Sequence, residues 1–213
     1  MLSINLNTSN TSSILNNLNI LNNLNSIVLA SGSPRRRDIL EILGISFEVF
    51  TADGPENLPD THPDPTLLVR DAALAKAREV RRRHPDSIVL AADTVVTVDG
   101  TILGKPTDPD DAVRMLRQLS GRSNVVHTGI AIIAADGSEA VDSESTVVHM
   151  ATMTESDIAW YVASGEPLDK AGAYAIQGLG ARYIKGIEGC YFNVVGLPVY
   201  RMLSLADTLG VRL

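Results

Sequence analysis

The sequence predicts an α/β domain with a mixed sheet and helices on its faces. Residues 27–40 form a strand, turn and helix unit, and apolar strands alternate with helical patterns through the first half of the chain. Asp99-Gly100 and Asp136-Gly137 are hairpin signals in the second half. Strand and helix alternation favours parallel pairing and hairpins require antiparallel pairing, so both kinds are expected in one sheet.

The composition is that of an ordinary globular protein, with 213 residues, 45% hydrophobic and 20% charged. A net charge of −7 argues against a broad nucleic-acid-binding surface, so any phosphate site must be a local basic pocket. The single cysteine, Cys190, excludes an internal disulfide and a cysteine-based zinc cluster, and it fits a reducing compartment. No apolar run approaches the length of a membrane span.

Residues 1–25 consist mainly of Asn, Leu, Ser and Thr and carry no charge. Their asparagine content disfavours helix, so we expect a disordered tail, followed by one domain over residues 26–213. The lack of Arg and Lys in this segment argues against a transit peptide or a secretory signal. We therefore expect a cytoplasmic protein.

The first ordered unit has the features of a phosphate cradle. Its helix begins at Ser33-Pro34, a favourable start, yet Arg35, Arg36 and Arg37 then place three positive charges at the positive end of the helix dipole. That arrangement costs stability unless an anion binds there. Free backbone N–H groups, the hydroxyls of Ser31 and Ser33 and the guanidinium groups suit a phosphate, although a solvated basic turn is an equal alternative.

The next elements follow from caps and turns. A short strand is expected at residues 47–50, then a long loop over residues 52–64 of the kind that is usually functional. Asp64 and Pro65 begin a helix that runs to about His84. The arginines at residues 81–83 face the negative end of its dipole, which explains them structurally.

The remaining elements are read in the same way. Strands are expected at residues 87–92, 95–98, 125–135 and 140–150, helices at residues 108–119, 154–165 and from Pro198, and short strands between residues 173 and 195.

Asp93 is the sharpest catalytic candidate, since it directly follows a buried strand, where ligands of open α/β sheets bind. Lys105 lies one hairpin further along. The run from Gly100 to Lys105 is one residue short of a P-loop, and Pro106 stands where Ser or Thr is required. These two departures exclude a Walker-type NTPase. Sugar-nucleotide transferases share the strand, glycine loop and arginine of residues 27–35, so they remain the alternative enzyme class.

Glycine is dense over residues 165–178, which suggests that backbone approaches a ligand there. Gln177 offers an amide donor and acceptor that suit the edge of a base. Lys76 and Glu56 do not stand out locally, because a lone helical lysine and a loop glutamate are usually solvated. The four histidines lack metal-ligand spacing, and His127 is assigned no role beyond packing.

Several ordered motifs together resemble the Maf family of nucleoside triphosphate pyrophosphatases over residues 27–203. They are Leu29-Ala30-Ser31-Gly32-Ser33-Pro34-Arg35-Arg36, Ala75-Lys76-Ala77, Ala92-Asp93-Thr94-Val95-Val96, Gly104-Lys105-Pro106, Asp169-Lys170-Ala171-Gly172-Ala173-Tyr174, Ile176-Gln177-Gly178 and Val195-Gly196-Leu197-Pro198. The resemblance implies a mixed α/β fold like that of inosine triphosphate pyrophosphatases, in which a bent, elongated sheet with flanking helices surrounds a central cleft.

The resemblance also implies a reaction, in which water attacks the α-phosphorus of a nucleoside triphosphate and releases the monophosphate and pyrophosphate. A divalent metal, Mg²⁺ or Mn²⁺, is the implied cofactor, with Asp93 and Glu56 as metal-binding positions. Asp93 matches the family's proton acceptor, and Glu56, Lys76 and Lys105 match its other polar cleft residues. General base and metal ligand are both open roles for Asp93.

The resemblance implies that Arg35, Thr94 and Gln177 determine substrate choice. Arg36 is expected to neutralise phosphate charge, and Arg37 is expected to face solvent. Threonine after the aspartate favours dTTP and UTP over 7-methyl-GTP. The family expectation is a homodimer. A regulatory nucleotide-binding protein linked to cell-division arrest is the alternative from another functional class.

Overall fold

The computed structural model describes residues 26–52 and 63–213. Its centre is a seven-stranded sheet in the order β2-β1-β3-β5-β6-β7, with β4 paired to β3 outside this path. The strands are β1 (Ile27–Leu29), β2 (Glu48–Val49), β3 (Ile88–Val98), β4 (Thr101–Leu103), β5 (Ser123–Ile133), β6 (Glu139–Met150) and β7 (Ile184–Glu188). β1 is parallel to β2 and β3, whereas all other pairs are antiparallel, so the predicted mixed sheet is confirmed.

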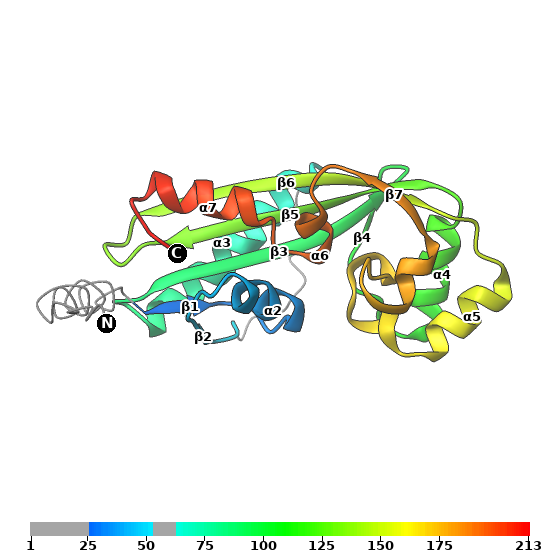
Figure 1. The fold of residues 1–213 in the computed structure, drawn as a ribbon, viewed down its shortest axis with the longest axis horizontal. Coiled ribbons are helices and arrows are strands. Elements are labelled where there is room, and N and C mark those ends of the chain that lie inside the picture. Colours follow the sequence, from blue (N-terminus) through cyan, green and yellow to red (C-terminus); the bar gives the residue numbers. More distant parts are fainter. Residues whose placement is uncertain (1–25, 53–62) are drawn as a thin grey trace, which may run out of the picture.

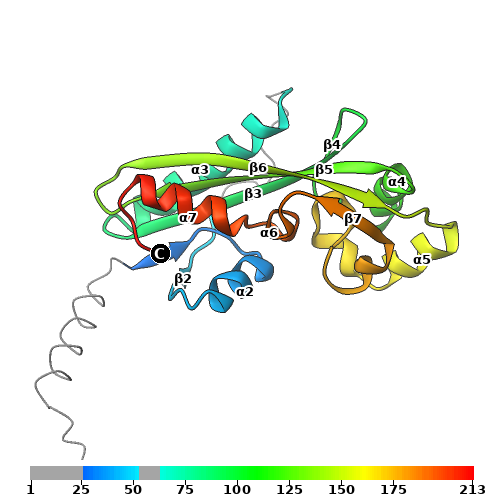
Figure 2. The same ribbon diagram turned by 45° about the horizontal axis from the view of Figure 1, so that its top comes forward.

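The helices cover both faces of this elongated sheet (Figures 1 and 2). They are α2 (Pro34–Ile42), α3 (Pro65–Arg83), α4 (Pro109–Leu119), α5 (Glu155–Ala163), α6 (Tyr191–Val195) and α7 (Val199–Thr208), with 3₁₀ helices η1 (Glu166–Asp169), η2 (Ala171–Ala173) and η3 (Gly178–Tyr183). Around β3, α3 lies on one face, and α2 and α7 lie on the other (Figure 2).

Two hydrophobic regions occupy opposite ends of β3. The first half of the strand packs on its alternate faces against α3 and against α2 and α7, through buried residues such as Val89 and Leu90. The second half packs Val96 and Val98 against α4 and α5, with Tyr161 fully buried among them. The middle of β3 therefore lies between two packed ends.

Local signals predicted most element boundaries. Asp64 accepts a hydrogen bond from the Thr66 amide at the start of α3, and Thr154 and Asp157 form a capping box on α5. Asp99 and Gly100 both have positive φ, 48° and 76°, as a two-residue hairpin of this kind requires.

One predicted region is wrong. Residues 173–195 hold a 3₁₀ helix, the single strand β7 and α6 rather than a series of short strands. Gly178 and Gly189 have positive φ there, which interrupts extended backbone. The predicted strand at residues 47–50 shortens to β2, and the strands predicted at residues 87–92 and 95–98 form one strand, β3. The predicted tail over residues 1–25 and Glu56 lie outside the described residues.

Candidate active site

The site lies at a gap along one edge of β3. On that edge, β1 pairs with residues 88–90 and β4 pairs with residues 96–98. Neither neighbour covers the strand between these pairings. A cavity of about 850 Å³ opens there, lined by Asp93 and Thr94 of β3 and by the segment that follows β1. Its volume is within the range of small-molecule sites.

Asp93 faces α3, where it meets Lys76. The Lys76 Nζ atom lies 2.5 Å from Asp93 Oδ1, and both side chains are largely withdrawn from solvent. Asp93 Oδ2 has no hydrogen-bond partner among the described residues, so this oxygen remains available to water or a cation. Lys76 is thus a cleft residue rather than a solvated surface lysine.

A glycine sets the distance between α3 and this part of the sheet. Gly129 of β5 is the register partner of Asp93. A Cβ atom at Gly129 would lie 2.1 Å from the carbonyl oxygen of Val69 in α3. Only glycine therefore allows the helix backbone to approach this closely, and that approach carries Lys76 to Asp93.

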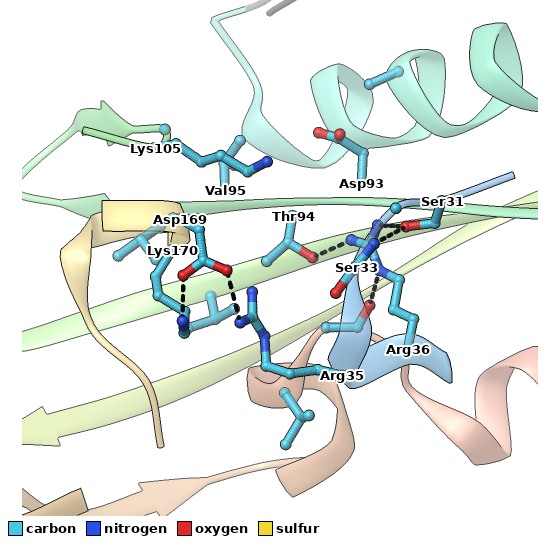
Figure 3. A pocket seen from close by; sticks show the side chains of 18 of the residues that line it. Ser31, Ser33, Arg35, Arg36, Asp93, Thr94, Val95, Lys105, Asp169 and Lys170 are labelled. Atoms are coloured by element: carbon cyan, nitrogen blue, oxygen red, sulfur yellow. Dashed lines mark hydrogen bonds and ion pairs between the residues drawn. The ribbon is translucent and has the colours of Figure 1, made fainter. Parts of the chain in front are cut away.

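Thr94 points to the opposite side of β3 (Figure 3). Its hydroxyl accepts a hydrogen bond from Arg36 Nη2 at 3.1 Å and is hydrogen bonded to the Thr128 hydroxyl at 2.9 Å. Both partners belong to the protein framework, since Thr128 is fully buried and Arg36 is 9% exposed.

Arg36 joins three parts of the chain. Its guanidinium donates to the Ala92 carbonyl and the Gly196 carbonyl, each at 2.8 Å, and to the Ser31 hydroxyl at 2.9 Å. It therefore fixes the segment after β1 to β3 and to the end of α6. The prediction that Arg36 neutralises phosphate remains untested, and its described contacts are structural.

The neighbouring Arg35 lies across the cavity from η1. Its Nη1 atom is 3.4 Å from Asp169 Oδ2, and the Asp169 carboxylate also pairs with Lys170 (Figure 3). Burial raises the pKa of Asp169, but hydrogen bonding to Lys170 and the charges of Lys170 and Arg35 outweigh it and hold this pKa below its usual value. Arg37 is exposed, as predicted.

The other predicted residues within the described chain also line the cavity. Lys105 follows β4 and lies on the Asp93 side of the strand (Figure 3). Ser31 is buried, and its hydroxyl accepts from the Ser33 amide at 3.3 Å. Gln177 is an exposed lining residue at the start of η3. The structure thus brings together every predicted site residue that it describes.

Several cleft residues were missed. Glu79, Asp169 and Lys170 also line the cavity. Glu79 lies three residues after Lys76, a spacing that places both side chains on one face of a helix. This spacing could have predicted that Glu79 lies in the cleft with Lys76. Asp169 and Lys170 stand in the glycine-dense stretch that suggested a ligand. Among the described residues the cavity holds five cationic and three carboxylate side chains, a local excess of positive charge in an acidic protein.

The chemistry of these groups accommodates a divalent cation. The described ranges contain no cluster of three or more His, Cys, Asp or Glu that could form a closed metal site. Magnesium at phosphate-transfer sites instead uses one or two carboxylates together with substrate phosphates. Asp93, with its available Oδ2, meets that requirement.

A mixed α/β domain with a nucleotide-sized cleft, a carboxylate at an open strand edge and surrounding cations has the features of a phosphate-ester or anhydride enzyme. The family model described as "Maf-like protein" matches residues 26–209, and the chain belongs to that family.

Similar proteins include a dTTP/UTP pyrophosphatase from Symbiobacterium thermophilum, 49% identical over 86% of this chain and 94% of the relative. Another, from Pelotomaculum thermopropionicum, is 47% identical over 86% of this chain and 96% of the relative. Among solved structures, the chain matches a dITP/XTP pyrophosphatase from Mycobacterium abscessus at 20% identity and a TM-score of 0.43, covering 86% and 97% of the two chains.

Proposed function

We propose that this chain hydrolyses nucleoside triphosphates, with dTTP and UTP favoured, to the monophosphate and pyrophosphate, and so removes excess or non-standard nucleotides. The observation that carries this proposal is the Asp93 and Lys76 pair, held at an open strand edge inside a cationic cleft. Relatives that are 41–49% identical and named dTTP/UTP pyrophosphatase support it.

The two sides of β3 suggest how a substrate lies. Asp93, Lys76 and Lys105 are on the α3 side, and we assign the triphosphate to them because cations there offset charge on the departing pyrophosphate. Arg35 and Gln177 line the rest of the cleft, and we assign the base to them together with Thr94. The triphosphate then crosses the uncovered edge of the strand.

Asp93 has one oxygen held by Lys76 and one available. We propose that the available oxygen accepts the proton of the attacking water or holds the metal. Asp93 and Glu56 would hold Mg²⁺ or Mn²⁺, which supplies positive charge to the phosphates when bound. Lys76 orients the carboxylate through its ion pair with Oδ1.

The wider context is also proposed. We assign residues 26–213 to one catalytic domain, and residues 1–25 to a tail. The structure describes no helix that is long and apolar enough to cross a membrane. A cytoplasmic location, a homodimer and the absence of nucleic-acid partners follow from the sequence reasoning and remain predictions.

The test is a substrate panel with pyrophosphate detection. Purified protein with Mg²⁺ is incubated separately with dTTP, UTP and 7-methyl-GTP, and we expect pyrophosphate from the first two. Preferential cleavage of 7-methyl-GTP would move the chain to that branch of the family. Binding without turnover would support a regulatory protein, and turnover that requires an added sugar phosphate would indicate a nucleotidyltransferase. Either result would overturn the proposal.

A further inference from the structure

We propose that Glu166 is a positioning residue for base recognition, acting through the loop that carries Gln177. This inference rests on the proposed function, in which Gln177 contacts the base. Glu166 begins η1 and belongs to the far end of the sheet, eleven residues before Gln177 in the chain. Its carboxylate nevertheless contacts the backbone of the loop that carries Gln177.

Three donors converge on this carboxylate. Oε1 accepts hydrogen bonds from the Tyr161 hydroxyl at 2.7 Å and from the Gly180 amide at 2.9 Å. Oε2 accepts one from the Leu179 amide at 2.9 Å. Two of the donors are the backbone amides two and three residues after Gln177, so one side chain holds the backbone of this loop.

The backbone of the loop is shaped to fit around Glu166. Gly178 has a φ of 75°, and a Cβ atom there would lie 2.4 Å from Glu166 Oε2. A Cβ atom at Gly180 would lie 2.5 Å from the Tyr161 hydroxyl. The same hydroxyl accepts from the Ala175 amide at 3.1 Å, on the other side of Gln177. Tyr161 and Glu166, which are hydrogen bonded to each other, therefore hold the loop both before and after Gln177.

Tyr161 and Glu166 are themselves held in place by packing and hydrogen bonds. Tyr161 is fully buried in the hydrophobic cluster between α4 and α5. Burial raises the pKa of Glu166, but the Leu179, Gly180 and Tyr161 hydrogen bonds outweigh burial and hold it below the usual value. The group is thus a carboxylate at neutral pH. All three partners donate, so an amide in its place would direct an NH₂ group at a donor.

The segment η1 also reaches the second proposed base-contacting residue. Asp169 at its end pairs with Arg35, and Lys170 donates to the Glu166 carbonyl at 3.0 Å. Gln177 and Arg35 come from distant parts of the chain, yet this four-residue segment contacts both the backbone that follows Gln177 and the Arg35 side chain. Substrate choice is thereby linked to a group that does not itself line the described cavity.

The test compares Glu166→Gln with a matched control, Glu155→Gln. Glu155 is on the same end of the molecule, where it pairs with Arg117 at the surface and does not line the cleft. For each protein, kcat and KM are measured with dTTP and with dGTP. We expect E166Q to lower the preference for dTTP over dGTP about tenfold, the effect of one misplaced hydrogen bond.

The change should be mainly in KM for dTTP, because base contacts stabilise bound substrate and transition state alike. E155Q should keep the preference of the unmodified protein. An equal loss of activity towards both nucleotides in E166Q, with the preference unchanged, would overturn the proposal, since a general structural defect lowers both.

A binding measurement separates this inference from the proposed function. If the unmodified protein turns over neither nucleotide, the proposed function fails. The Kd values for dTTP and dGTP, measured by titration calorimetry, then take the place of the kinetic ratio. A tenfold loss of binding preference in E166Q would still support the positioning role, whereas an unchanged Kd ratio would contradict it.

Discussion

Asp93 and Thr94 are adjacent in β3, yet their side chains enter opposite surroundings. Asp93 faces α3, and among the described residues one of its oxygens is paired with Lys76 and the other has no partner. Thr94 faces the other side, where its hydroxyl is hydrogen bonded to Arg36 and Thr128. Because side chains alternate along a strand, a single open edge presents to one cleft both a carboxylate on the α3 side and a hydroxyl held by framework residues on the other side.

The two cations that are bonded to these residues also differ from each other. Among the described residues, Lys76 pairs with Asp93, whereas Arg36 donates to acceptors on several parts of the chain, including the Ala92 and Gly196 carbonyls. Positive charge in a cleft therefore does not by itself indicate substrate binding. We expect substitutions on the Asp93 side to affect turnover and substitutions around Arg36 to affect folding first.

The largest effect is expected for Asp93→Asn. This change keeps the size of the side chain but removes its charge and basicity. General acid–base catalysis contributes about 10²–10⁴-fold in rate, so kcat/KM for dTTP should fall by that factor while the melting temperature changes little. Asp99→Asn, in the exposed turn that follows the same strand, is the control and should retain full activity. An active D93N variant would remove Asp93 from the mechanism.

Arg36→Met should reduce stability by about 3 kcal/mol, because it leaves the buried carbonyls of Ala92 and Gly196 without their donor. Urea unfolding measures this loss. The neighbouring Arg37→Met changes an exposed side chain and should leave the free energy of unfolding unchanged. If R36M unfolded like the unmodified protein but bound dTTP poorly, Arg36 would belong to the substrate site instead.

Gly129→Ala should cost about 2 kcal/mol, since a methyl group would overlap the Val69 carbonyl and push α3 from the sheet. The shift would also separate Lys76 from Asp93 and lower activity. Gly186→Ala is the control, because a Cβ atom there meets nothing within 4 Å. Thermal unfolding and dTTP turnover of both variants check the prediction, and an unaffected G129A variant would contradict the proposed close approach.

The smallest effect concerns His127. Burial lowers the pKa of this histidine, partly opposed by the charge of Asp64. A base whose pKa is lower in the folded state binds fewer protons there than in the unfolded chain. Stability should therefore decline as the pH falls below about 6.5, the pKa of histidine in the unfolded chain. Replacing His127 with Gln should reduce the change in the free energy of unfolding between pH 7 and pH 5, as measured by urea unfolding. If that change were the same in the variant, other groups would cause the pH dependence.

Local sequence signals predicted the elements that local interactions determine. Asp64 and Pro65 begin α3 as expected, and the Asp99-Gly100 turn adopts the required positive φ values. The prediction for residues 173–195 was wrong because residues distant in the sequence determine the backbone conformation there. The turn at Gly178 forms around the Glu166 carboxylate, which no pattern within the loop reveals.

The candidate site likewise contains residues that local signals predict and residues whose roles depend on the tertiary structure. The buried apolar run before Asp93 is a local signal that singled out this carboxylate, and Asp93 does line the cavity. The expectation that it follows the end of a strand is wrong, because it lies in the middle of β3. The role of Lys76 depended on how closely α3 approaches β5 at Gly129, which is a property of tertiary packing. The contact of Arg35 with Asp169 joins residues 134 positions apart and depends on the whole fold.

Hydrolysis of dTTP in water labelled with ¹⁸O tests the central claim most directly. If the Asp93 side of the cleft directs water to the α-phosphorus, mass spectrometry should find one ¹⁸O atom in dTMP and none in pyrophosphate. Label in the pyrophosphate, or products consisting of dTDP and inorganic phosphate, would contradict the account.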